Sequence, residues 1–222
     1  MPEALSPSAK VMGVVSAATI MLVGVLYAIV LGFGFATLSS PAEPIGNPYF
    51  TVLEVLILVL APAMVALMAT VHAWSPQESK ALSLAALSFT AMLATITCSV
   101  HFSILTLSGQ PGLGGHALAG AMLAFKWPSV VYALDILAWD VFFALSMLFA
   151  ALVFEGGGIN RAIRISMAVS GVLALAGLSG VALGDMTIRN IGIAGYLGAF
   201  LVVDALLLTL FLRCDPTRPR DL

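Results

Sequence analysis

Long apolar runs recur along this chain of 222 residues. A helix rises 1.5 Å per residue, so about 20 apolar residues are enough to cross the hydrocarbon core of a bilayer. The runs are continuous instead of alternating, which argues against a transmembrane β-barrel. Only 9% of the residues are charged, too few to cover the surface of a soluble domain. The sequence therefore predicts an all-α, polytopic integral membrane bundle.

The chain is expected to form a single transmembrane domain, in which turn-forming stretches separate six helices. They include the prolines between Ser39 and Pro48, the polar link from Ser75 to Lys80, and the three glycines that begin at Gly156. The approximate spans are residues 11–37, 49–74, 81–107, 128–154, 165–183 and 191–212. Residues 117–125 are apolar but too few to cross, so we expect them to lie in the interface or to re-enter.

Lysine and arginine placement predicts that both termini are cytoplasmic. With that orientation the inner side receives Lys10, Lys80, Arg161, Arg164, Arg213, Arg218 and Arg220, and the outer side only Lys126 and Arg189. We expect a multi-pass protein of a bacterial-type inner (plasma) membrane, with the lipid bilayer as its first partner. The net charge of −2 and the absence of a basic patch argue against nucleic acid.

Five ionisable residues lie inside the apolar spans, where each charge costs about 2.5 kcal/mol or more. Counted from the span ends, Glu54, His101 and Asp135 each fall about 8 to 11 Å below the outer face. Asp140 is deeper and about 140° around the helix from Asp135, so the two acids should not share a narrow face. Asp204 falls near the middle or in the inner half.

This layer predicts a polar pocket that opens in the outer half. We expect Asp135, Glu54, His101 and Asp140 to be the catalytic, proton-handling residues, since a buried acid can donate a proton that a nearby carboxylate or imidazole takes back. The expected substrate-binding residues are Trp139, Tyr132, Thr97 and Asp204. Asp185 and Arg189, four residues apart, would cap the entrance or form a surface ion pair. The alternative is a purely structural role, in which the acids only hydrogen-bond to neighbouring helices.

No metal or cofactor is predicted. The two cysteines, Cys98 and Cys214, lie in different regions, and no histidine and cysteine spacing suits a metal. No phosphate-binding loop, HExxH or nucleophile elbow is present.

Three classes of function fit these features. The one that the sequence slightly favours, because the polar groups lie together in the outer half, is an acid–base enzyme, an isomerase or cyclase, acting on a lipid-soluble, isoprenoid-like substrate. The second is a proton-coupled transporter or proton relay. The third is a non-catalytic subunit of a membrane complex or homo-oligomer, because Gly180, Gly184, Gly192, Gly195 and Gly198 have spacings that suit close helix packing.

In outline, with an acid on an early helix and another on the last, the chain is similar to small membrane enzymes acting on isoprenoids and sterols. These include the emopamil-binding-protein type isomerases and the integral-membrane meroterpenoid cyclases. The likeness to the cyclases implies that Glu54 and Asp204 are paired catalytic acids. Those cyclases have seven spans, whereas this sequence predicts six.

Overall fold

The computed structural model describes residues 5–40, 43–110, 112 and 117–214, and in that part of the chain every regular element is a helix. Six helical stretches there are long and apolar enough to cross a membrane, which confirms the expected all-helical class and number of apolar helices. They are Pro7–Ala36, Tyr49–Trp74, Gln77–Leu107, Val130–Ala151, Gly158–Leu183 and Met186–Arg213. The last two begin earlier than expected because polar first turns precede their apolar runs.

The elements are as follows: α1 (Pro7–Ala36), α2 (Tyr49–Trp74), the 3-10 turn η1 (Gln77–Ser79), α3 (Lys80–Leu107), α4 (Ala117–Leu123), α5 (Val130–Ile136), η2 (Leu137–Phe143), α6 (Ala144–Ala151), α7 (Gly158–Leu183), α8 (Met186–Ile193), η3 (Ala194–Ala199) and α9 (Phe200–Arg213). Two of these, η2 and η3, are π-helices inserted into the fourth and sixth spans. The fourth span therefore runs α5–η2–α6 and the sixth runs α8–η3–α9.

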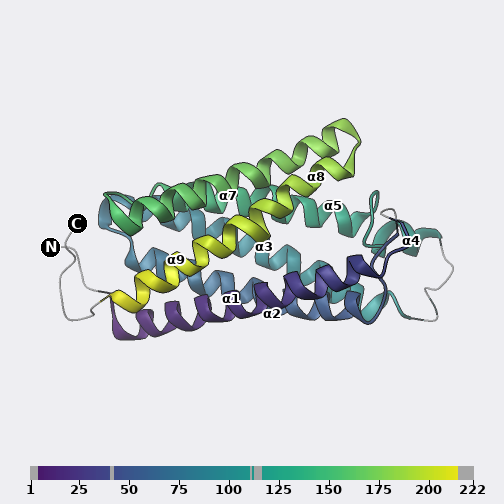
Figure 1. The fold of residues 1–222 in the computed structure, drawn as a ribbon, viewed down its shortest axis with the longest axis horizontal. Coiled ribbons are helices and arrows are strands. Elements are labelled where there is room, and N and C mark those ends of the chain that lie inside the picture. The colour runs from purple at the N-terminus through teal and green to yellow at the C-terminus, as the bar shows by residue number, and fades with distance from the viewer. Residues whose placement is uncertain (1–4, 41–42, 111, 113–116, 215–222) are drawn as a thin grey trace.

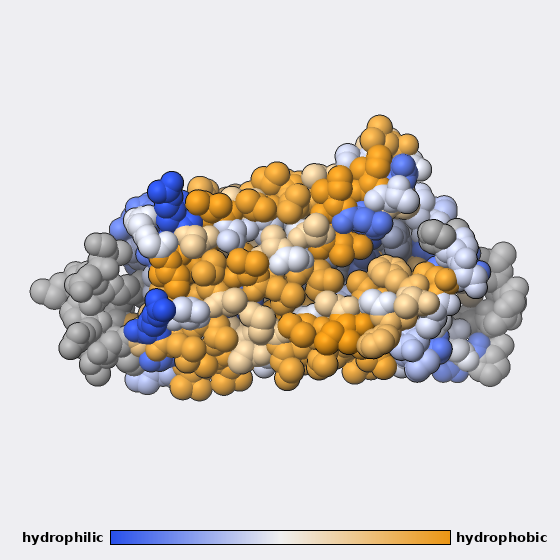
Figure 2. All heavy atoms as spheres, viewed as in Figure 1, coloured by the Kyte–Doolittle hydropathy of each residue, from blue (hydrophilic) through white to orange (hydrophobic). Residues whose placement is uncertain are grey.

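The spans pack as a closed ring. Each packs against its neighbour in sequence, and α9 returns to pack against α1 (Figure 1). The first and last helices begin and end at the same end of the bundle, where Lys10 Nζ donates to the Cys214 carbonyl over 2.6 Å. Hydrophobic side chains cover the middle of the face shown in Figure 2, and hydrophilic ones gather at its two ends. This distribution is typical of a bundle surrounded by lipid.

Local signals in the sequence set the helix ends. Ser6 caps α1 by accepting from the Ala9 amide, with Pro7 in the first turn, and Ser129 caps α5 by accepting from the Tyr132 amide. Gly184 ends α7 in the left-handed conformation, at φ 70°. This corrects the expectation that Gly184 is a packing glycine, since no atom would meet a Cβ there.

Small residues bring the last two spans into close contact. A Cβ on Gly180 would lie 2.6 Å from the Arg189 amide nitrogen, and one on Gly195 would lie 2.8 Å from the Ser170 carbonyl oxygen. Only glycine allows such an approach of two backbones. Gly198, also expected to pack, has open space around it. The close backbone contacts between α7 and the last span therefore lie in α8 and η3.

Candidate functional site: a buried ion-pair cluster

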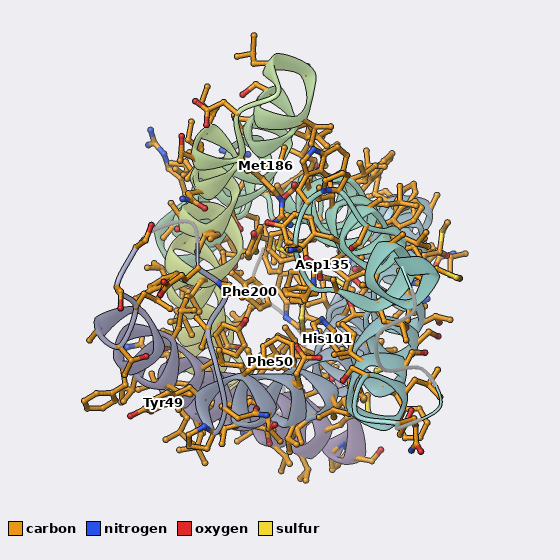
Figure 3. All side chains as sticks on the ribbon, turned by 90° about the vertical axis from the view of Figure 1, so that its right-hand side faces the viewer. Tyr49, Phe50, His101, Asp135, Met186 and Phe200 are labelled. Carbon is orange, nitrogen blue, oxygen red and sulfur yellow. The ribbon has the colours of Figure 1, made fainter. Side chains whose placement is uncertain are left out.

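Five ionisable side chains from five elements meet inside the bundle, and we call them the ion cluster: Glu54 of α2, His101 of α3, Asp135 of α5, Asp140 of η2 and Arg189 of α8. Their exposed fractions are only 2, 2, 5, 0 and 6%, respectively. In the end-on view of Figure 3, His101 and Asp135 lie toward the interior of the ring. The structure thus brings together all four residues expected to handle protons and adds an arginine.

His101 lies between two carboxylates. Its Nδ1 is 2.8 Å from Glu54 Oε2, a hydrogen bond, and its Nε2 is 3.5 Å from Asp135 Oδ1 without hydrogen-bond geometry. The three residues come from three adjacent spans and meet at one level along the bundle, as the counting of helical turns predicted. Both nitrogens of one buried imidazole therefore face an acid.

Arg189 binds both aspartates of the fourth span. Its Nε donates to Asp140 Oδ2 over 3.1 Å, its Nη2 to Asp135 Oδ2 over 3.2 Å, and its Nη1 to the Tyr132 hydroxyl over 3.0 Å. The guanidinium carbon also lies 4.9 Å from the centre of the Tyr132 ring. Of the two alternatives for Asp185 and Arg189, the surface ion pair is wrong, because Arg189 binds Asp135 and Asp140 inside the bundle.

The π-helix explains how Asp135 and Asp140 reach the same arginine. In an α-helix a separation of five residues turns the second side chain away, which was the basis for expecting different faces. In a π-helix the hydrogen bonds join residues five apart, so such residues become neighbours on one face. The insertion of η2 between α5 and α6 therefore overturns that expectation.

Glycines determine where Arg189 lies. Cβ atoms on Gly177 and Gly180 of α7 would lie 3.2 and 2.6 Å from the Arg189 carbonyl oxygen and amide nitrogen. A Cβ on Gly192, one turn after Arg189, would lie 2.9 Å from Asp140 Oδ1. The backbone of α8 therefore lies close to both α7 and η2, and a long side chain on its inner face reaches the acids.

Aromatic rings cover the cluster. Phe125, just after α4, has its ring centre 5.5 Å from that of His101 and 5.3 Å from that of Tyr132. Deeper in the bundle, Trp139 packs against Tyr196 at 5.2 Å and against Phe143 at 5.9 Å. Trp139, which was expected to bind substrate, forms part of this inner aromatic group. The aromatic groups restrict water around the charges.

Two of the expected binding residues stand apart from the ion pairs. Thr97 is buried one turn before His101, and its hydroxyl has no hydrogen-bond partner. Asp204 of α9 is fully buried, and neither carboxyl oxygen has a hydrogen-bond partner. It lies twelve residues, or about 18 Å of helix, beyond Gly192, which touches Asp140. The third, Tyr132, joins the cluster through Arg189.

Asp185 lies outside the cluster, on the exposed turn between α7 and α8. Its carboxylate accepts hydrogen bonds from the hydroxyl and amide of Thr187, and these bonds lower the pKa of Asp185 below its usual value. The residue is the N-cap of α8. It therefore fixes the start of the helix that carries Arg189.

The site has more acids than bases. Glu54, Asp135 and Asp140 supply three negative charges when ionised, and Arg189 and a protonated His101 supply two positive ones. No group of three or more histidine, cysteine, aspartate or glutamate residues in the described chain is arranged to hold a metal ion. The chemistry that this set supports is proton transfer.

The sequence reasoning missed three contributors to the site. Arg189 was expected only at the pocket entrance or in a surface ion pair, although an arginine beside an apolar run was a usable signal for a partner of the buried acids. Tyr27 of α1 and Tyr196 of η3 were not expected in the site. Tyr27 lies within electrostatic range of Asp135 and Glu54, and Tyr196 within range of Arg189 and Asp140.

Comparisons with protein-family models, with curated proteins and with solved structures find no match for this chain.

Proposed function

We propose that the protein spans a bacterial-type inner membrane and moves protons within it, as a proton relay or a proton-coupled transporter. The observation that carries this proposal is the imidazole of His101 held between Glu54 and Asp135. A protonated Glu54 gives its proton to Nδ1 while the proton on Nε2 passes to the Asp135 carboxylate. The imidazole ends in the other tautomer, and one proton has moved from acid to acid.

The proposed orientation places the cluster in the outer half and both termini in the cytoplasm. Lys10, Lys80, Arg161, Arg164 and Arg213 lie on the inner side in this orientation. Arg189 was counted for the outer side, but its guanidinium is bound inside the bundle. Among the described residues only Lys126 then remains as an outer basic group, which strengthens the positive-inside bias.

Transport is favoured over catalysis because Arg189 occupies the position where a substrate would meet the two aspartates. Two shallow grooves lie along the outer face of α3, and neither is lined by a residue of the ion cluster. An acid–base enzyme of the isomerase or cyclase type remains the second candidate. The feature that supports it is the aromatic cover of His101 by Phe125, a surface suited to a lipid-soluble, isoprenoid-like molecule.

The test is proton flux in sealed liposomes that carry the purified protein and an internal pH dye, with a potassium gradient and valinomycin to set the voltage. We expect His101→Gln to lower the flux to the level of empty liposomes, and Glu54→Gln to do the same. His72→Gln is the matched control, because His72 bonds to Ser83 near the α2–α3 turn. It should leave the flux unchanged.

A second measurement separates the candidates. Nitrogen NMR of labelled histidine in bilayers should show that His101 changes tautomer or charge between about pH 5 and pH 9. Titration without flux would overturn the relay and favour the enzyme. If the His101 ring does not titrate and the protein gives no flux, both the relay and the enzyme would be overturned. The non-catalytic subunit would then be the remaining hypothesis.

A further inference from the structure

We infer that Asp204 of α9 is a second proton-binding site, which carries protons between the inner end of the bundle and His101. The inner end is the one where Lys10 binds the Cys214 carbonyl. Among the described residues, Asp204 is the only buried carboxyl group outside the ion cluster. As a carrier for the relay it rests on the proposed function, whereas its protonated state rests on its burial alone.

No basic side chain in the described part of the chain binds Asp204. The carboxyl group is fully buried, and neither oxygen has a hydrogen-bond partner. The elements that pack against α9 are α1, α7 and η3. Their titratable side chains, none of which hydrogen-bonds to Asp204, are Lys10, Tyr27, Arg161, Arg164 and Tyr196. An ionised carboxyl group without a cation is costly in apolar surroundings, so Asp204 holds a proton.

A structural role through hydrogen bonds does not account for this side chain. Such a role needs a partner on a neighbouring helix, as Ser170 has in the Gly195 carbonyl over 2.9 Å. The Asp204 carboxyl has no such partner among the described residues, although buried polar groups in folded proteins are nearly always bonded. The carboxyl is instead available for exchange of its proton.

Asp204 faces the same level of the interior as Ser146. The ring centre of Phe200, labelled in Figure 3, lies 5.3 Å from that of Phe143. The fourth and sixth spans both run from the α5 and α8 end toward the inner end (Figure 1). Asp204 follows Phe200 by four residues and Ser146 follows Phe143 by three, so each lies about one turn further inward on the same side of its helix. Both side chains are buried.

Hydroxyl groups connect this level with His101. Ser146 and Thr90 share a buried hydrogen bond of 2.6 Å. Thr90, Thr97 and His101 follow one another on the buried face of α3, about 10 and 6 Å apart along the helix. The Thr97 hydroxyl and His101 Nε2 have no hydrogen-bond partner among the described residues. These atoms can bind water that enters during the transfer, since a hydroxyl both donates and accepts.

The transfer moves one proton from Asp204 to Glu54. The Asp204 O–H bond breaks, the proton passes along hydroxyl groups and water to Nε2 of neutral His101, and an imidazolium forms. The imidazolium gives its Nδ1 proton to the ionised Glu54, 2.8 Å away. The Asp204 carboxylate then takes a proton from the inner end, where Arg213 lies about 13.5 Å further along the helix. The reverse steps move a proton inward.

The first test is infrared difference spectroscopy in lipid bilayers at neutral pH, with Asp204→Asn subtracted from the parent protein. We expect the C=O band of a protonated carboxyl group, which the variant lacks, and a shift of this band in D₂O because the proton exchanges. Asp185→Asn is the control, because the hydrogen bonds that lower the pKa of this exposed carboxyl keep it ionised. A carboxylate band from Asp204, or a C=O band that D₂O leaves unshifted, would overturn the inference.

The second test is proton flux in the sealed liposomes used for His101→Gln. Asp204→Asn keeps the shape of the side chain without its acidic proton and should lower the flux at least about tenfold. Gly198→Ala is the control on the same span, since nothing lies within 4 Å of a Cβ there. Thr97→Val should also lower the flux. Thr95→Val, the same change at an exposed position of α3, should not.

Equal flux in Asp204→Asn and Gly198→Ala would overturn the inference. Flux that is lost in His101→Gln but kept in Asp204→Asn removes the Asp204 site alone, whereas the opposite result removes the His101 relay and leaves Asp204. If the parent protein gives no flux, the infrared band decides. A band that shifts in D₂O then leaves Asp204 as a site of proton exchange without transport, and an unshifted band removes the site.

Discussion

Arg189 donates its Nε–H to Asp140 over 3.1 Å, and this bond joins the start of the last span to the π-helix of the fourth. The same guanidinium reaches Asp135, so one cation serves two buried acids. Removing one partner of a buried ion pair is strongly destabilising, because the other charge stays buried without compensation. The stability of the cluster should therefore depend on this arginine more than on any single acid.

Arg189→Gln should lower the free energy of unfolding by about 3–5 kcal/mol, because both aspartates lose their cation. The free energy of unfolding of Arg189→Lys should lie between those of the parent protein and Arg189→Gln, since a single ammonium cannot reproduce the contacts of a guanidinium fork. The measurement is equilibrium unfolding in detergent, followed by circular dichroism. Arg161→Gln, at an exposed position of α7, should change the value by no more than about 0.5 kcal/mol. Equal losses in both glutamine variants would contradict this account.

Glu54 and His101 should be energetically coupled. A double-mutant cycle with Glu54→Gln and His101→Gln should give an interaction energy of about 0.5–3 kcal/mol, because the two side chains share a buried hydrogen bond of 2.8 Å. The same cycle with His72→Gln in place of His101→Gln should give a value near zero. Strict additivity for the first pair would mean that the contact does not contribute to stability.

Gly180→Ala should displace α8. The new methyl group would lie 2.6 Å from the Arg189 nitrogen and 2.7 Å from the Asp185 carbonyl oxygen, both backbone atoms that cannot rotate away. We expect a loss of about 1–3 kcal/mol in unfolding free energy. Gly32→Ala is the control, since it lies in α1 with nothing within 4 Å and should gain up to about 1 kcal/mol from helix propensity. Loss in both variants would indicate a general intolerance of alanine.

Asp204→Asn should preserve stability, in contrast to Asp140→Asn. The Asp204 carboxyl is fully buried without a hydrogen-bond partner, and such a group is favourable only in its neutral form, which asparagine reproduces in charge and shape. In Asp140→Asn, by contrast, Arg189 loses one of its two acids. Thermal unfolding should show a midpoint near that of the parent for the first and a lower one for the second. The reverse order would indicate that Asp204 has an ionic role.

The stability of the first turn of α8 should depend on pH through the ionisation of Asp185. The pKa of this carboxyl is lower in the folded protein than its usual value, so its stabilising effect is present above the usual range and is lost as the pH falls through the lowered value. The protection factor of the Thr187 amide, which compares its exchange rate with that of an unstructured amide at the same pH, should therefore fall on acidification, because that amide donates to the carboxylate. Asp185→Asn keeps an N-cap that does not titrate and should remove the pH dependence. An unchanged pH dependence in this variant would exclude Asp185 as its source.

Much of the fold could be predicted from the sequence because hydropathy is local. A run of apolar residues needs no knowledge of the rest of the chain to be read as a helix of spanning length, and all six such helices were found. The common level of Glu54, His101 and Asp135 along the bundle also followed from local counting, since a helix rises by a constant amount per residue. Antiparallel neighbours with groups at equal depth can then meet, as these three do.

The tertiary structure alone decided the rest. Whether Arg189 faces lipid, water or the interior depends on the rotation of α8, which the backbone contacts at Gly177 and Gly180 set. Whether Asp135 and Asp140 face one cation depends on a π-helix, and no residue pattern in Leu137–Phe143 predicts a π-helix. The sequence by itself determined which groups lie in the apolar spans and that three of them lie at one level along the bundle. Helix rotation and the packing of distant segments decided which charge neutralises which, because these depend on contacts between residues far apart in the chain.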